Sequence, residues 1–442
     1  MNAARGSAVA AGLCALLTAC LYHPILAHGF VNLEDYWLIV DNPHLRGLSR
    51  PDLAWMFTSL DYGTYQPLGW LTYAVIHAWR GLDPAAFHLV SWLTHAACAA
   101  LLFLAAVRVL RAAAPRATER DLLTAGAAAA LTWALHPMRV EQVAWATGLP
   151  DVLATFFFLA AVLAYLRPSL GLCLGLYLVS SLFRWKGVSL PVVLLALDVF
   201  ILRRTLDRRA WLEKLPFFLV AAAFSAVNAR SKLLLAPGHA FDLGLHAAAG
   251  PIFYLGKLLA PVHLTLDYWI PESLPLAAAF VGLSAAVFVK AERRESAGAA
   301  WACFAAGLAP SLVMSFRGLV VAHDRATYLP ALSLHLLLGG GVLAALRGGR
   351  ARRLAALAAV VVVVAALGAL SRAQLPVWRD SESLWRRVLA EPAPPDYAHL
   401  SLAHALLEQG RRDEAAAELR EQLRLFPGDR RVEGLARELG RR

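Results

Sequence analysis

Long apolar stretches separated by short polar connections run along most of the chain. A helix needs roughly 20 apolar residues to cross a bilayer. Candidate spans lie at 8–28, 87–107, 121–136, 151–166, 169–183, 187–202, 212–229, 274–290, 299–315, 326–346 and 354–372. A further apolar stretch, 248–270, contains prolines and charged residues, so we expect it to enter and leave the membrane on the outer side. The pattern predicts an all-α, polytopic transmembrane helical bundle of about eleven spans.

The pattern changes after Arg372, where charged residues become dense. Residues 396–426 read as two amphipathic helices around Gly410. When Pro427 is taken as the closing position of a 34-residue tetratricopeptide repeat, small or packing residues fall where that repeat needs them: Ala403, Gly410, Ala415 and Leu419. We therefore predict a transmembrane domain at 1–373 and a soluble tetratricopeptide-like tail at 374–442, packed on the membrane domain or on a partner.

Composition supports lipid as the solvent of the first domain. Apolar residues make up 59% of the 442 residues and charged residues only 17%, against about 25% in soluble domains. The net charge of +11 does not indicate nucleic acid, because no basic stripe with interleaved aromatics is present. The five cysteines show no CxxC pair and no metal-ligand spacing.

Basic clusters at the ends of the apolar stretches predict the orientation. The clusters are Arg108/Arg111/Arg116/Arg120, Arg203/Arg204/Arg208/Arg209 with Lys214, Lys290/Arg293/Arg294 and Arg347/Arg350/Arg352/Arg353. The positive-inside rule assigns them to the cytoplasm, together with the N-terminus. The C-terminal tail and several polar loops then lie outside, which for a bacterial inner membrane is the periplasm. The outer loops carry Glu34, Asp35, His136, Arg139, Glu141, Arg184, Lys186, Arg317, His323, Asp324 and Arg325.

Glu34 and Asp35 form an adjacent acid pair directly after the first span. Two carboxylates at a membrane surface repel each other and lose solvation, which raises at least one pKa. Such a group can act as a general base toward a hydroxyl. The alternative is structural, with Asp35 capping a short interfacial helix and Glu34 facing water.

Arg325, Arg184 and Lys186 are the candidate anion-binding residues. An arginine at the outer end of a span offers a forked, permanently charged donor to a phosphate. The alternative is that these side chains anchor helices at the interface. His88 and His95 share a helix face but lack a third ligand, so metal binding competes with polar packing between helices.

Several motifs in order resemble the transmembrane and tetratricopeptide repeat-containing (TMTC) proteins of the GT-C superfamily of membrane glycosyltransferases, related to the protein O-mannosyltransferases. The motifs are FVNLEDYWLIVDNPHL, YQPLGWLTYAVIHAWRGLDPAAFHLVSWLTH, ALHPMRVEQVAWATGLPDVLATFFFLAAVLAY, FYLGKLLAPVHLTLDY and HDRATYLP, followed by the repeat-like tail. The resemblance covers nearly the whole chain.

The resemblance implies transfer of a sugar, mannose among the candidates, from a polyprenyl-phosphate donor to an acceptor hydroxyl at the outer face, with inversion at the anomeric carbon. It implies Asp35 first and Glu34 second as the base, and Arg325 near the lipid phosphate. Further active-site candidates are His136, Arg139, Glu141, Asp151 and Tyr328. A protein acceptor or partner at the tail is implied, and a divalent cation is left open.

The sequence departs from the family pattern in several places. The acid pair has the order Glu34-Asp35, Gly148-Leu149-Pro150 precedes Asp151 where the family has Gly-Arg-x, and the repeat array is reduced to about one unit. These departures keep a second hypothesis open, a catalytically inactive membrane-anchored scaffold whose repeat unit binds a partner. A lipid or solute transporter is the weakest alternative, because no inverted repeat is visible.

Overall fold

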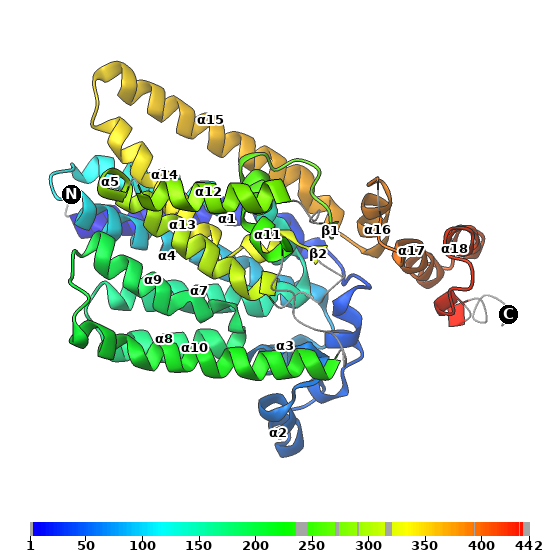
Figure 1. Ribbon diagram of the computed structural model, residues 1–442. Coiled ribbons are helices and arrows are strands. Elements are labelled where there is room, and N and C mark those ends of the chain that lie inside the picture. Colours follow the sequence, from blue (N-terminus) through cyan, green and yellow to red (C-terminus); the bar gives the residue numbers. More distant parts are fainter. Residues whose placement is uncertain are drawn as a thin grey trace.

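The computed structural model describes residues 3–235, 245–269, 274–289, 291–313, 321–392, 394–432 and 434–435. Helices make up nearly all regular structure in these ranges, and the predicted all-α class is confirmed (Figure 1). The larger part of the chain contains α1 (Ala3–Tyr22), α2 (Arg50–Thr58), α3 (Pro67–Arg80), α4 (Pro84–Ala113), α5 (Glu119–Ala134), α6 (Val140–Ala144), α7 (Leu149–Tyr165), α8 (Leu170–Phe183), α9 (Leu190–Ala196), α10 (Arg208–Leu235), α11 (Leu245–Leu259), α12 (Leu274–Val289), α13 (Ala291–Val313), α14 (Ala331–Leu346) and α15 (Arg350–Gln374). The tail contains α16 (Ser381–Leu389), α17 (Ala398–Glu408) and α18 (Arg412–Leu425). Two short strands, β1 (Tyr268–Trp269) and β2 (Val321–Ala322), pair antiparallel.

Five helical segments are long and apolar enough to cross a membrane, and the chain is an integral membrane protein. They are Ala4–Ala27, Pro84–Ala113, Ala146–Tyr165, Arg208–Leu235 and Arg350–Trp378. Shorter apolar helices lie at Leu170–Phe183, Ala247–Leu259, Leu274–Val287, Ser296–Leu312 and Ala331–Leu346. Each predicted span overlaps a helix, but the number of crossings and their orientation stay predictions. Lys290 and Arg317 lie outside the described residues.

Helix α4 lies at the centre of the bundle, where it packs against α1, α5 and α7. Helix α14 crosses α5 at close range. A Cβ atom added at Gly339 of α14 would lie 2.9 Å from the backbone oxygen of Ala125, so only glycine fits this crossing. The absence of a side chain at Gly339 thus permits the close approach of the two helices.

One end of the bundle holds the polar connections that carry the basic clusters. Figure 1 shows the α14–α15 connection and the start of α10 at the same end as the N-terminus. Asp198 is buried there and forms ion pairs with Lys214 (2.6 Å) and Arg204 (3.3 Å). An ion pair between Arg353 and Asp121 (2.7 Å) ties α15 to α5.

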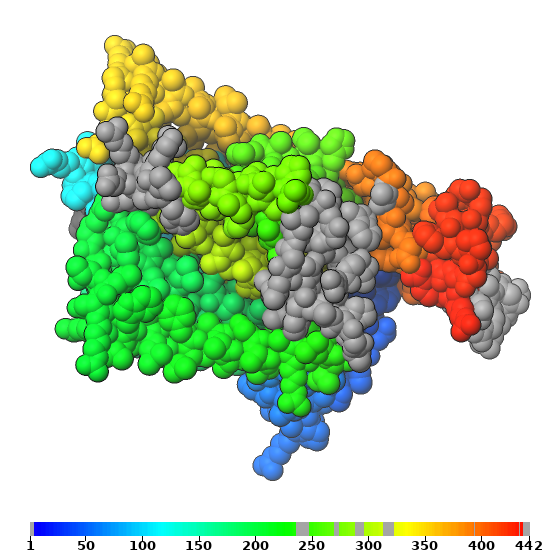
Figure 2. All heavy atoms as spheres, in the orientation of Figure 1, coloured from blue at the N-terminus to red at the C-terminus, as the bar shows by residue number. Residues whose placement is uncertain are grey.

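The tail projects from the opposite end of the bundle, as the space-filling view shows (Figure 2). Helices α17 and α18 pack against each other across a turn at Gly410, whose φ of +75° favours glycine. Ala403, Ala415 and Leu419 are buried. The helix pair that the sequence predicts is therefore present, and the division of the chain at residues 373/374 stays a prediction.

Candidate active site

Asp35 lies in the loop after α1 and is almost fully buried, with 1% of its surface exposed. One carboxylate oxygen accepts hydrogen bonds from the backbone nitrogen (2.8 Å) and the hydroxyl (2.6 Å) of Thr147, and the other accepts from the backbone nitrogen of Val31 (3.0 Å). The side chain therefore does not cap the helical turn Tyr36–Val40 that follows. Burial raises the pKa of Asp35 to about 7, although these hydrogen bonds lower it.

Glu34 is half-buried, whereas its neighbour Asp35 is buried. Among the described residues its carboxylate has no hydrogen-bond or ion-pair partner within bonding distance. Burial lowers the pKa of Arg325, but the carboxylates of Glu141 and Glu34 raise it above its usual value. The carboxylate of Glu34 thus lies within electrostatic range of this guanidinium. The structure brings together an accessible acid and a buried one on consecutive residues.

Arg325 lies in the helical turn Asp324–Thr327, directly after β2. Its guanidinium forms an ion pair with Glu141, and its backbone nitrogen donates to the other carboxylate oxygen of Glu141 at 2.9 Å. The guanidinium carbon also lies 5.0 Å from the centre of the Trp145 ring, a cation–π contact. These three contacts fix the side chain, which keeps 17% of its surface exposed.

Arg184 and Lys186 share one carboxylate, that of Asp151 at the start of α7. Arg184 Nε lies 2.9 Å from one oxygen and Lys186 Nζ 3.1 Å from the other. Burial lowers the pKa of Lys186, and the Asp151 carboxylate opposes that shift without cancelling it. Lys186 is the more accessible cation, with 26% of its side chain exposed against 12% for Arg184.

Residues 141–147 connect the acidic loop to the cationic side of the site. Asp35 binds this segment at Thr147, and Arg325 binds it at Glu141 and Trp145. The segment ends in a tight turn, because a Cβ atom at Gly148 would lie 2.3 Å from the backbone oxygen of Gln142. Asp35 and Arg325 are thus attached to one short segment.

His136, Arg139 and Tyr328 lie deeper than the sequence suggests. All three are buried. His136 Nε2 contacts the backbone oxygen of Leu258 (3.0 Å), Arg139 donates to the Thr327 hydroxyl (2.8 Å), and the Tyr328 hydroxyl contacts His95 Nδ1 (2.7 Å). Of the three, Arg139 contacts the turn that carries Arg325, through Thr327.

The sequence alone predicts no role for three further residues near the site. Thr147 binds Asp35, and Trp145 contacts Arg325. In the sequence, only their position four to six residues after Glu141 could have indicated these contacts. Asp324 is buried and accepts a hydrogen bond from the Tyr268 hydroxyl at 2.9 Å. Burial, followed by the Glu141 carboxylate, raises the pKa of Asp324 to about 8.

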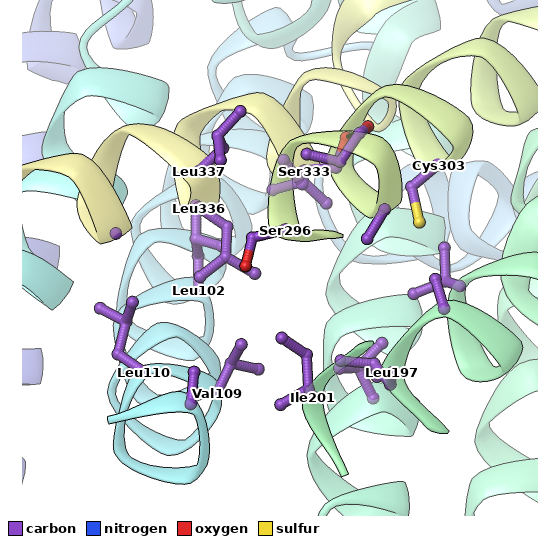
Figure 3. A pocket seen from close by; sticks show the side chains of 18 of the residues that line it. Leu102, Val109, Leu110, Leu197, Ile201, Ser296, Cys303, Ser333, Leu336 and Leu337 are labelled. Carbon is purple, nitrogen blue, oxygen red and sulfur yellow. Dashed lines mark hydrogen bonds between the residues drawn. The ribbon is translucent and has the colours of Figure 1, made fainter. Parts of the chain in front are cut away.

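An apolar cavity of about 390 Å³ extends from this region into the bundle. It lies between α4, α7, α9, α13 and α14, and the close-up shows leucine, valine and isoleucine side chains around its open centre (Figure 3). Ser296, Ser333 and Cys303 are among the few residues with polar side chains that line it. A much smaller hollow contains Asp151, Lys186 and Arg325, and both cavities share Leu329 and Pro330 as lining residues. The apolar cavity therefore borders the cationic cluster.

Metal ligands do not gather in the described ranges, where no group of three or more His, Cys, Asp or Glu could hold a metal ion. His88 contacts the backbone oxygen of Gly29 (3.3 Å), and His95 contacts Tyr328 and the backbone oxygen of Ala134. His95 thus makes polar contacts between α4 and α5, whereas His88 contacts the loop after α1.

Comparison with known proteins confirms the resemblance to the TMTC family. Protein O-mannosyl-transferase TMTC2 of Mus musculus is 33% identical over 159 residues, which are 32% of this chain and 17% of the relative. TMTC1 of Homo sapiens is 29% identical over 235 residues (46% and 25%), and TMTC3 of Homo sapiens is 27% identical over 206 residues (42% and 21%). The matches thus span a quarter or less of each of these relatives. No family model and no solved structure matches the chain.

Proposed function

We propose that this protein is a membrane glycosyltransferase that transfers a sugar from a polyprenyl-phosphate donor to an acceptor hydroxyl at the outer face of the membrane. One observation carries the proposal: the cationic cluster of Arg325, Arg184 and Lys186 lies beside an accessible carboxylate and borders an apolar cavity. The curated relatives are named protein O-mannosyl-transferases, which makes mannose the first sugar to test and a protein the first acceptor.

The donor is proposed to bind with its isoprenoid tail in the apolar cavity and its phosphate near Lys186 and Arg325. An isoprenoid chain needs a hydrophobic groove, and a phosphate needs fixed cationic donors. When the bond from the sugar C1 to the phosphate oxygen breaks, negative charge develops on that oxygen. Preorganised cations there stabilise the transition state more than the ground state.

The acid pair is proposed to activate the acceptor. The sequence favours Asp35 as the base, but its carboxylate is enclosed by three hydrogen bonds and 1% exposed. Glu34 is half-buried, so its carboxylate is more accessible than that of Asp35, and it lies within electrostatic range of Arg325. We therefore assign proton abstraction to Glu34 and positioning of the loop to Asp35. The acceptor oxygen gives its proton to Glu34, bonds to C1 with inversion, and the polyprenyl phosphate leaves.

The proposed orientation puts the acidic loop and the tail in the bacterial periplasm and the basic clusters in the cytoplasm. Its support is the position of the tail at the end of the bundle opposite to the N-terminus (Figure 1). The division into a transmembrane domain at 1–373 and a tail at 374–442 belongs to the same proposal.

A second candidate is the inactive scaffold. The observation in its favour is that every cation of the cluster already has an internal carboxylate partner, Glu141 for Arg325 and Asp151 for Arg184 and Lys186. Internal pairing leaves less charge for a phosphate. The scaffold predicts that the protein does not bind polyprenyl phosphate at all.

The test is transfer of radiolabelled mannose from polyprenyl-phosphate mannose to a threonine-containing peptide by the full chain in lipid vesicles. We expect Glu34→Gln to lower the rate by about 10² or more, the usual contribution of a general base. Asp41→Asn, an exposed acid in the same loop, is the matched control and should retain the rate. No transfer and no binding of polyprenyl phosphate by the unmodified protein would favour the scaffold.

A further inference from the structure

We infer that the C-terminal tail is a brace of the candidate active site, in which Trp385 and Tyr397 are positioning residues that hold the two sides of the site in register. The inference rests on the proposed function. It assigns to the tail a role within the membrane enzyme, in addition to any binding of a partner.

The first arm of the brace reaches the acidic loop through Asn32, two residues before Glu34. The Asn32 side chain accepts a hydrogen bond from Trp385 Nε1 (2.6 Å) and donates to the backbone oxygen of Ser401 (2.9 Å). Its backbone nitrogen donates to the Ser381 hydroxyl (2.8 Å). All three partners belong to the tail, so the backbone amide, the side-chain amide nitrogen and the side-chain oxygen of one asparagine all bind there.

The second arm reaches the cationic side of the site through Asp267, just before β1. The Tyr397 hydroxyl donates to one carboxylate oxygen of Asp267 (2.5 Å), and His323 Nδ1 lies 3.1 Å from the other. Because His323 directly follows β2 and stands two residues before Arg325, this contact constrains the turn that carries the guanidinium.

The two arms meet inside the tail. The rings of Trp385 and Tyr397 contact each other edge to face, with their centres 5.7 Å apart, and Trp385 is fully buried. A continuous series of contacts therefore runs from Asn32 through both aromatic residues to Asp267 and His323. Asn32 and His323, each two residues before Glu34 and Arg325, are thereby joined through a part of the chain that belongs to neither loop.

This series of contacts is well placed to position the acidic loop relative to the turn that carries Arg325. Transfer requires the base and the phosphate-binding cation at a fixed separation, and small displacements cost orders of magnitude in rate. The acidic loop and the β1–β2 connection come from distant parts of the sequence. Hydrogen bonds to buried or charged groups give the tail a defined geometry, because breaking one leaves an unpaired polar group.

The experiment uses two substitutions in the full chain. Tyr397→Phe removes the hydroxyl donor and keeps the ring, and Trp385→Phe removes the indole Nε1–H donor and leaves a smaller aromatic ring in its place. We expect each to lower kcat for mannose transfer about tenfold, the effect of one hydrogen bond to a charged or buried group. KM for polyprenyl-phosphate mannose should stay within about twofold, because the donor site keeps its own contacts. The matched control is Glu418→Gln, which breaks an ion pair with His399 inside the tail (2.6 Å) and should leave kcat unchanged.

A second measurement does not depend on transferase activity. Hydrogen exchange of the backbone amides should accelerate at residues 31–36 and 321–325 together in either variant, and in neither loop for Glu418→Gln. Acceleration in both loops of a protein without transferase activity would support the brace and contradict the proposed function. Normal transfer with unchanged kcat in both variants, or acceleration limited to the nearer loop, would overturn the brace.

Discussion

Arg325 and Glu141, separated by 184 positions in the sequence, form an ion pair that fixes the guanidinium of the candidate active site. The carboxylate binds both the side chain and the backbone nitrogen of Arg325. Trp145 contacts the same guanidinium. Arg325 is therefore held in place before any ligand arrives, as expected for electrostatic catalysis by a preorganised group.

Loss of the Glu141 carboxylate should destabilise the protein. Glu141 is 2% exposed and Arg325 17%, so Glu141→Gln leaves a mostly buried charge without its partner. Breaking such a pair costs about 3–5 kcal/mol, and we expect the lower end because water reaches part of Arg325. Thermal unfolding in detergent measures the loss. The control is Glu119→Gln, which breaks an exposed pair with Arg111 and should cost less than about 1 kcal/mol; equal losses would contradict the role of burial.

Asp35 should make stability depend on pH. Its pKa is raised by burial from 3.8 to about 7, so the folded protein binds a proton that the unfolded chain releases at lower pH. The contribution of Asp35 to stability is therefore full below about pH 4 and is lost as the pH rises through about 7.

Comparison of the unmodified protein with Asp35→Asn isolates this contribution from those of other titrating groups such as Asp324. Apparent melting temperatures measured from pH 4 to pH 8 should fall more steeply in the unmodified protein than in the variant. Parallel profiles would show that Asp35 does not titrate in this range.

The fold could be predicted from the sequence to a large extent, because a membrane helix needs a long apolar stretch and each such stretch became a helix. Helix α11 shows the limit of this argument. The apolar stretch 248–270 divides into a helix that ends at Leu259 and a connection that leads to β1. Strand β1 pairs with β2, which lies more than fifty residues later in the chain. No local sequence pattern predicts a pairing at that distance.

Residues of the candidate site could be predicted from the sequence where the charge of the side chain by itself suggests a chemical role. Glu34, Asp35 and Arg325 stood out because charged residues are rare near spans. The contact of Asp35 with Thr147 and that of Asn32 with Trp385 join positions 112 and 353 residues apart. A threonine or an asparagine in a loop carries no signal of such a partner, because its hydrogen bonds depend on how the helices pack.

Lys186 should contribute to binding of the donor phosphate. It keeps 26% of its side chain exposed and borders the hollow shared with Arg325. We expect Lys186→Gln to weaken binding of polyprenyl phosphate about tenfold, the effect of one charge-assisted hydrogen bond. Flotation of vesicles that contain labelled polyprenyl phosphate, or a fluorescence titration, would measure this. Arg209→Gln, at an exposed position in the first turn of α10, serves as the control and should bind normally.

The apolar cavity should select donors by the length of their isoprenoid chain. Ala300 of α13 lines the cavity and is buried, so Ala300→Leu places three additional carbon atoms into space that a lipid chain would occupy. We expect KM for a long polyprenyl-phosphate mannose to rise about tenfold or more, since each excluded methylene is worth about 0.8 kcal/mol. A short donor, mannosyl phosphate with a methyl group in place of the isoprenoid chain, places no chain carbon beside Ala300, and its KM should change little. Val361→Leu, on the exposed face of α15, adds bulk outside the cavity and controls for general effects on the membrane domain. Equal increases in KM for the short and the long donor would mean that the chain binds elsewhere, for instance along the exposed face of α15.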